Sequence, residues 1–143
     1  MHMRGEPRTM QAEPRYDDVV AEVCAFLAAR AEAAMASGVA RERIWLDPGI
    51  GFGKTLDHNL TLLAHLDRLV GLGFPVLLGL SRKSFIARLD PAAASADRRL
   101  PASLAGALAG AAAGVAAVRV HDVAETVQAL KVWRAIEAAR GAG

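Results

Sequence analysis

Three clusters of polar side chains come directly after short apolar runs in the sequence. The first extends from Asp47 to Lys54, the second from Ser81 to Ser84 and the third from Arg119 to Asp122. Together they supply carboxylates, several cations, hydroxyls and an imidazole. Cations bind phosphoryl and carboxylate groups, whereas a carboxylate accepts hydrogen bonds from the N–H groups of a heterocycle. The clusters therefore favour binding of a small molecule that carries both an anion and N–H donors.

The first cluster is rich in glycine and partly matches two phosphate-binding patterns. A P-loop requires G-x-x-x-x-G-K-[ST], but Pro48, which has no N–H, stands where its first glycine belongs. The spacing also departs from the dinucleotide-binding G-x-G-x-x-G pattern. Two interpretations stay open. The glycines only permit a tight turn, or they form a compact loop beside Asp47, whose carboxylate binds ligand N–H groups.

The second and third clusters concentrate cations. Ser81, Arg82 and Lys83 place two positive charges side by side, which repel each other unless an anion or electron-rich ligand shares the site. A solvated basic turn is the alternative interpretation. Arg119 and His121 stand two residues apart on a predicted strand, so both side chains point to the same side. This pair suits a phosphate or pyrophosphate, although a strand-end histidine also serves as a structural hydrogen-bonding group.

Hydrophobic spacing predicts helices and strands that alternate along the chain. Apolar residues recur at helical spacing in 16–37, 60–70 and 122–136, and short apolar runs at 44–46, 75–80 and 116–120 predict buried strands. Parallel neighbours need a long connection, which the helices supply, so the pattern predicts a parallel sheet with right-handed crossovers. Each polar cluster then follows a strand, at the edge where α/β folds build their sites.

A run of small residues from position 102 onward predicts one more helix. Gly106, Gly110 and Gly114 are four residues apart and form a smooth face on it. The run is too short and too poor in large side chains to span a membrane. We expect this face to pack against the sheet, and the alternative is a helix–helix contact between subunits. At the start of the last predicted helix, Asp122 and Glu125 have the spacing of a capping box.

Composition narrows the class of protein further. A chain of 143 residues with 53% hydrophobic and 22% charged residues fits one globular domain. The net charge of +2 is dispersed, so no nucleic-acid partner is expected. Cys24 is the single cysteine, and no signal peptide is recognisable, which suits a cytoplasmic protein. His58 and His65 lack the neighbouring ligands of a metal site.

Segments of this sequence, in order and spacing, resemble the signature segments of the dihydropteroate synthase family. They are 1–11, 47–54, 79–84 and 119–122. The resemblance extends over essentially the whole chain. It implies an α/β fold, a partial TIM (β/α)8 barrel, in which residues 1–143 form the C-terminal half of a pterin-binding domain, from the end of strand 5 through helix 8.

The resemblance also implies an activity in folate biosynthesis. Members of the family condense 6-hydroxymethyl-7,8-dihydropterin pyrophosphate with para-aminobenzoate, releasing 7,8-dihydropteroate and pyrophosphate, and they are the target of sulfonamides. Mg²⁺ is the implied cofactor. Its protein ligand would lie in the N-terminal half of the barrel, so no metal ligand is expected in this chain.

Site residues follow from the resemblance position by position. Pyrophosphate is assigned to Arg119 and His121, and para-aminobenzoate to Ser81, Arg82 and Lys83. The pterin-binding residues are expected to be Asp47, Lys83, Met1 and Phe52.

The length of the chain sets an expectation about partners. A TIM barrel takes about 250 residues, so this chain corresponds to a barrel without its first half. Open sheet edges and an uncovered apolar face would need a homodimer or the complementary half. Two alternatives stay open: a non-catalytic pterin-binding fragment that needs a partner chain, and a related folate-dependent methyltransferase domain. The segment 81–84 argues against the methyltransferase.

Overall fold

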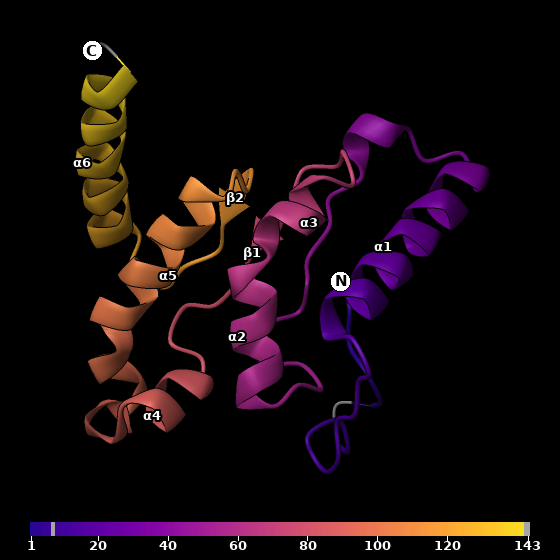
Figure 1. The fold of residues 1–143 in the computed structure, drawn as a ribbon, viewed down its shortest axis with the longest axis horizontal. Coiled ribbons are helices and arrows are strands. Elements are labelled where there is room, and N and C mark those ends of the chain that lie inside the picture. Colours follow the sequence, from indigo (N-terminus) through magenta and orange to yellow (C-terminus); the bar gives the residue numbers. More distant parts are fainter. Residues whose placement is uncertain (7, 142–143) are drawn as a thin grey trace.

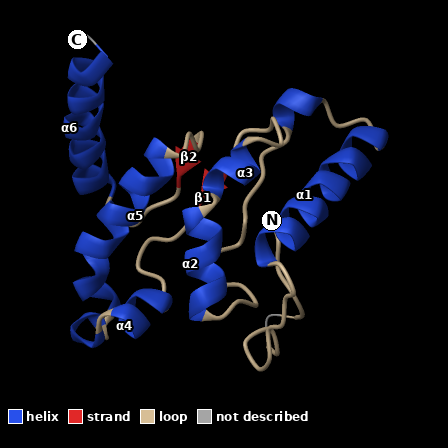
Figure 2. Cartoon of the chain, in the orientation of Figure 1, coloured by secondary structure: helices blue, strands red, loops and turns tan. Residues whose placement is uncertain are grey.

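The computed structural model describes residues 1–6 and 8–141 and combines helices with short parallel strands (Figures 1 and 2). The helices are α1 (Val19–Ala36), α2 (Leu56–Ala64), α3 (Leu66–Val70), α4 (Phe85–Leu89), α5 (Leu100–Ala112) and α6 (Val123–Gly141). The strands are β1 (Leu77–Leu78) and β2 (Ala117–Val118), and the 3₁₀ helices are η1 (Arg41–Arg43), η2 (Pro91–Ala93) and η3 (Ala96–Arg99).

Parallel pairing follows the order of the chain. β1 pairs with β2, with Leu77 opposite Ala117, and Leu46 forms a parallel bridge to Val76 on the other side. The backbone N–H of His2 donates to the carbonyl oxygen of Asp47 at 3.0 Å, so the first residues lie beside the segment at Leu46. Helices connect these extended segments, as parallel pairing requires. The predicted parallel α/β order is therefore confirmed.

The regular elements are shorter than the periodicity predicts. The strands expected at 75–80 and 116–120 have only two residues each in ladder pairing, and Val76, just before β1, forms an isolated bridge to Leu46. The helix expected over 60–70 is divided at His65, whose φ of −121° interrupts the helix between α2 and α3. At the start of α1, the carboxylate of Asp18 accepts from the backbone N–H groups of Val20 and Ala21.

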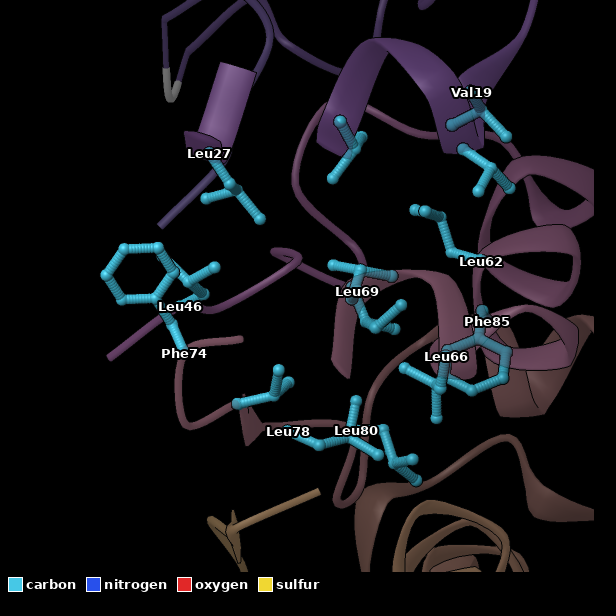
Figure 3. Packing of buried hydrophobic residues seen from close by; sticks show 14 of the residues in the cluster. Val19, Leu27, Leu46, Leu62, Leu66, Leu69, Phe74, Leu78, Leu80 and Phe85 are labelled. Carbon is cyan, nitrogen blue, oxygen red and sulfur yellow. The ribbon is translucent and has the colours of Figure 1, made fainter. Parts of the chain in front are cut away.

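The hydrophobic core lies between α1, α2, α3 and the extended segments, as Figure 3 shows. Leu27 of α1 and Leu69 of α3 face Leu46 and Leu78, and each of these side chains is at most 3% exposed. Burying side chains of this size stabilises a fold by about 1.5–3 kcal/mol each. This core holds the strand ends, and with them the polar clusters, in place.

Helix α5 packs closely on β1. A Cβ atom added at Gly106 would lie 2.5 Å from Leu80 Cδ1, and one at Gly110 would lie 2.7 Å from Leu78 Cδ2. The expected packing of the small-residue face against the sheet is therefore confirmed for these two glycines. Gly114 lies beyond the end of the helix with a φ of +85°, so it terminates α5 and is not part of its face.

Helix α6 contacts α5 and stands at the end of the arrangement (Figure 1). Thr126 is its one buried residue among those that the structure describes. Several of its apolar side chains are exposed, namely Val123, Val127, Val132 and Ile136. Within residues 1–6 and 8–141, no helix combines the length and the apolar character that crossing a membrane requires.

Candidate functional site

A pocket of about 530 Å³ opens where β1 and β2 end. Polar and cationic side chains from the second and third sequence clusters surround it. Its lining residues are Gly79, Ser81, Arg82, Lys83, Arg119, Val120 and His121. The structure thus brings together the residues predicted for para-aminobenzoate and those predicted for pyrophosphate. Concentrated positive charge of this kind suits an anion.

The glycine-rich loop lies next to the pocket residue Lys83, which bonds to the carbonyl oxygen of Ile50. Gly49, Gly51 and Gly53 all have positive φ, between 62° and 82°, a region that glycine enters without strain. A Cβ atom at Gly49 would lie 1.8 Å from the carbonyl oxygen of His2. These glycines therefore form a tight turn and let the first residues of the chain approach the loop, while the carboxylate of Asp47 accepts from the N–H of Gly49 at 2.7 Å.

A buried lysine holds the glycine-rich loop together. Lys54 is 2% exposed, and its ammonium donates to the carbonyl oxygens of Gly49 and Phe52, each at 3.0 Å. Its third contact is Nδ1 of His2, also at 3.0 Å. Burial, with repulsion from Lys83 as a smaller cause, lowers the pKa of Lys54 to about 8. Lys54 thus fixes the backbone on both sides of the loop.

Lys83 connects the loop to the pocket. Its ammonium donates to the carbonyl oxygen of Ile50 and lies 4.5 Å from the centre of the Phe52 ring, a cation–π contact. Burial lowers the pKa of Lys83 to about 8; Asp47 opposes this shift and Arg119 adds to it. Of the residues predicted to bind the pterin, Asp47 therefore acts electrostatically on Lys83, and Phe52 contacts it directly.

Ser81 orients the imidazole of His121. Its hydroxyl oxygen accepts from the backbone N–H of His121 at 3.2 Å and lies 3.0 Å from the ring Nδ1. With Nδ1 engaged in this way, Nε2 is the ring nitrogen available to a ligand in the pocket. Ser81 is buried, so the imidazole is oriented before any ligand arrives.

The guanidinium of Arg82 is held by the carboxylate of Asp122. The two groups form a two-point ion pair, including Nε to Oδ2 at 3.0 Å. This contact raises the pKa of Arg82 and lowers that of Asp122. The carboxylate of Asp122 therefore pairs with Arg82. The capping box predicted from the spacing of Asp122 and Glu125 is not formed by this carboxylate.

Met1 stands apart from the other expected site residues. It is 57% exposed and does not line the pocket, although its neighbour His2 is hydrogen-bonded to Asp47. Its expected contact with the pterin stays a prediction.

Sequence reasoning missed the supporting residues of the site. Lys54 and His2 hold the glycine-rich loop, and Asn59 accepts from the N–H of Gly51 at 2.7 Å through its side-chain oxygen. Ser103, 3% exposed, accepts from the N–H of Arg82 at 2.9 Å. The lysine that ends the glycine-rich run is the one signal in the sequence that pointed to any of them.

In residues 1–6 and 8–141, no three His, Cys, Asp or Glu side chains gather in an arrangement that could hold a metal ion. Mg²⁺ usually takes only one or two protein carboxylates together with water and substrate phosphates, so the expectation about its ligands stays a prediction.

Comparisons with known proteins show which family this chain belongs to. The model of the "Pterin binding enzyme" family matches residues 1–121. A dihydropteroate synthase of Neisseria meningitidis serogroup B is 52% identical over 139 residues, which are 95% of this chain and 48% of that protein. The chain therefore spans about half the length of the curated relatives it matches.

Solved structures agree in fold as well. Dihydropteroate synthase from Stenotrophomonas maltophilia, with imidazole bound in its active site, superposes with a TM-score of 0.91 at 51% identity, covering 96% of this chain and 51% of that one. The Thermus thermophilus enzyme in complex with 6HMPPP gives a TM-score of 0.89 at 49% identity, covering 95% and 53%. The partial α/β barrel is thereby confirmed, and the chain belongs to the pterin-binding enzyme family, together with these dihydropteroate synthases.

Proposed function

We propose that this chain is the C-terminal part of a dihydropteroate synthase and that residues 1–143 belong to one pterin-binding domain. The observation that supports this most strongly is the pocket at the carboxyl ends of β1 and β2. There Lys83, Arg119 and His121 gather beside Asp47 and Phe52, so cations for an anion adjoin a carboxylate and an aromatic ring for a heterocycle.

The proposed substrates are 6-hydroxymethyl-7,8-dihydropterin pyrophosphate and para-aminobenzoate. The N–H groups of the pterin would donate to Asp47, with Phe52, Lys83 and Met1 beside the ring. Complexes of the Thermus thermophilus relative with 6HMPPP and with 4-aminobenzoate support this choice. Para-aminobenzoate would occupy the part of the pocket bordered by Ser81, Arg82 and Lys83.

The reaction requires stabilisation of a departing anion. The C–O bond between the pterin methylene carbon and pyrophosphate breaks, and its electron pair leaves with the pyrophosphate oxygen. The amine nitrogen of para-aminobenzoate then forms a C–N bond to that carbon and loses a proton. Lys83, Arg119 and Nε2 of His121 would hold the developing charge, and donors placed in advance are effective because they need no reorganisation during the reaction.

The proposal also includes a Mg²⁺ cofactor, a partner chain and a cytoplasmic location. Mg²⁺ would neutralise pyrophosphate charge, with protein ligands from outside this chain. A homodimer or the complementary half of the barrel would cover the exposed apolar face of α6. The free Cys24 supports a reducing, cytoplasmic setting. The complex of the Yersinia pestis relative with a sulfonamide drug supports sulfonamides as ligands of this protein too.

Product formation tests the proposal directly. The chain is incubated with dihydropterin pyrophosphate, labelled para-aminobenzoate and Mg²⁺, alone and after mixing with the N-terminal half of the Neisseria meningitidis relative. We expect labelled dihydropteroate in the mixture.

Asp47→Asn and Arg119→Met should each weaken binding of the pterin pyrophosphate by about tenfold or more, since hydrogen bonds to charged groups contribute about 1.5–3 kcal/mol. Affinity should also fall as the pH rises through about 8, where Lys83 loses its charge.

Arg30→Met is the matched control, because Arg30 is exposed on α1 and lies outside the pocket. It should leave binding and turnover unchanged. Binding without product in both preparations would favour the non-catalytic pterin-binding fragment. If the mixture shows no binding and forms no product, the proposed function is contradicted.

A further inference from the structure

The conformation of Arg82 is unusual for a residue with a side chain. Its φ of +56° lies in the left-handed region, and it is the one residue other than glycine with positive φ in the part of the chain that the structure describes. Such conformations persist only where the surroundings hold them, and they concentrate at functional sites. The contacts that hold Arg82 therefore indicate what its position is for.

The backbone N–H, the carbonyl oxygen and the guanidinium of Arg82 each have a partner in the protein. Its N–H donates to the hydroxyl of Ser103 at 2.9 Å, and its carbonyl oxygen accepts from the guanidinium of Arg99 at 2.8 Å. Ser103 in turn donates to the carbonyl oxygen of Arg99 at 2.7 Å, which closes a ring of contacts at the start of α5. The guanidinium of Arg82 is paired with Asp122.

The Arg82–Asp122 pair joins the two loops that bear the anion-binding side chains. Arg82 precedes Lys83 in the loop after β1, and Asp122 follows His121 in the loop after β2. Ser81 makes a second connection between the same loops through His121. Lys83 and Arg119 repel each other across the pocket, as the effect of Arg119 on the pKa of Lys83 indicates. An arrangement of like charges needs fixed supports before an anion arrives.

We propose that Arg82 and Asp122 are positioning residues: their ion pair holds Lys83 and His121 around the anion pocket, and the Arg82 guanidinium acts through Asp122 instead of binding substrate. This inference rests on the proposed function, because it names the support of the same site. Asp122 also neutralises Arg82, which leaves Lys83 and Arg119 as the cations that face the ligand.

The direction in which one substitution changes pyrophosphate affinity distinguishes a positioning role from a simple electrostatic effect. Asp122→Asn removes a negative charge next to an anion pocket, so electrostatics alone predicts tighter binding of pyrophosphate. Positioning predicts weaker binding, by tenfold or more. The measurement is calorimetric titration of the purified full chain with inorganic pyrophosphate. Glu125→Gln is the matched control, because it removes the same charge from an exposed carboxylate nearby that has no hydrogen bond to Arg82, and its binding should be unchanged or slightly tighter.

Exchanging the two charges distinguishes loss of the ion pair from general destabilisation, because only loss of the ion pair should be repaired by the exchange. Arg82→Asn removes the guanidinium but keeps a residue type that tolerates positive φ, and it should lower pyrophosphate affinity as Asp122→Asn does. The exchanged pair, Arg82→Asp with Asp122→Arg, should restore affinity to within a few-fold of the original chain. Asp122→Asn binding as tightly as the original, or an exchanged pair no better than the single variants, would overturn the proposal.

Nitrogen NMR of the His121 ring distinguishes failure of this proposal from failure of the proposed function. Arg82→Asn should change the ring signals of His121, although position 82 is far from it in sequence, and the exchanged pair should restore them. Unchanged signals in Arg82→Asn would overturn the positioning role. No pyrophosphate binding by the original chain, together with the expected signal changes, would contradict the proposed function alone.

Discussion

The His2 ring shows how burial decides the charge of a single residue. It is 6% exposed, packs edge-on against Phe26 at 4.9 Å between ring centres, and lies 3.0 Å from the ammonium of Lys54. Burial, followed by repulsion from Lys54 and Arg4, lowers the pKa of His2 to about 4. The ring is therefore neutral at pH 7, and its Nδ1 accepts a hydrogen bond from Lys54.

This neutral ring predicts a loss of stability in mild acid. The pKa of His2 is 6.5 when the chain is unfolded and about 4 when it is folded, so between these values the unfolded chain binds more protons. The free energy of unfolding therefore decreases as the pH falls from 6.5 to 4, by at most about 3 kcal/mol from this residue. Denaturant titrations at pH 7 and pH 4.5 measure it. His2→Gln, whose amide oxygen also accepts from Lys54, should lose less stability over this interval, and an equal loss in both proteins would contradict the prediction.

Close packing of α5 on β1 is the feature that matters at the scale of elements. Gly106 and Gly110 bring the backbone of the helix onto Leu80 and Leu78, the residues that lead into the loop of Ser81. The start of the same helix carries Ser103, which holds Arg82. The position of α5 thus affects both the core and the wall of the pocket.

Substituting Gly106 tests this packing. A Cβ atom there would overlap the end of Leu80, so Gly106→Ala should destabilise the fold by about 1–3 kcal/mol through overpacking, partly offset by about 1 kcal/mol of better helix propensity. Leu80→Val makes room, so the double variant should lose less than the sum of the single losses. Ala105→Gly, on the exposed side of α5, is the control and should show no coupling to Leu80→Val. Additive losses for Gly106→Ala and Leu80→Val would count against the close approach.

At the scale of the whole molecule, the chain has apolar surface that none of its described residues covers. Val132 and Ile136 of α6 are 58% and 48% exposed, and together with Leu104 and Leu108 of α5 they line an apolar groove of about 500 Å³. Soluble monomers rarely expose large contiguous apolar patches. The chain also spans about half the length of its relatives, which points to the remaining barrel units as one source of cover.

We therefore expect the isolated chain to bind an apolar fluorescent dye and to self-associate as its concentration rises. Adding the N-terminal half of the Neisseria meningitidis relative should reduce dye fluorescence and raise the thermal midpoint, because the added units bury this surface. Dye titration and size-exclusion chromatography provide the measurements. An unrelated globular protein at equal concentration serves as the control, and equal effects of both additions would refute the expectation.

Local patterns determined much of what the structure contains. Periods of apolar residues predicted the helices and the parallel order of the extended segments, because a helix face and a buried strand each impose a repeat on neighbouring residues. The clusters after the strands predicted where polar side chains would gather, since parallel strands present their carboxyl ends at one edge. Resemblance to a known family then assigned roles to Asp47, Lys83, Arg119 and His121 that composition and spacing alone left open.

Tertiary structure alone decided which polar groups meet. Asp122 has the spacing of a helix cap, yet its carboxylate pairs with Arg82, 40 residues away, and Lys54 finds its partner His2 at a separation of 52 residues. Such contacts leave no period in the sequence, because they arise only when the core brings distant loops to the same edge. Burial acts in the same way: the pKa values of His2, Lys54 and Lys83 shift because the folded chain removes them from water, and no local pattern encodes that removal.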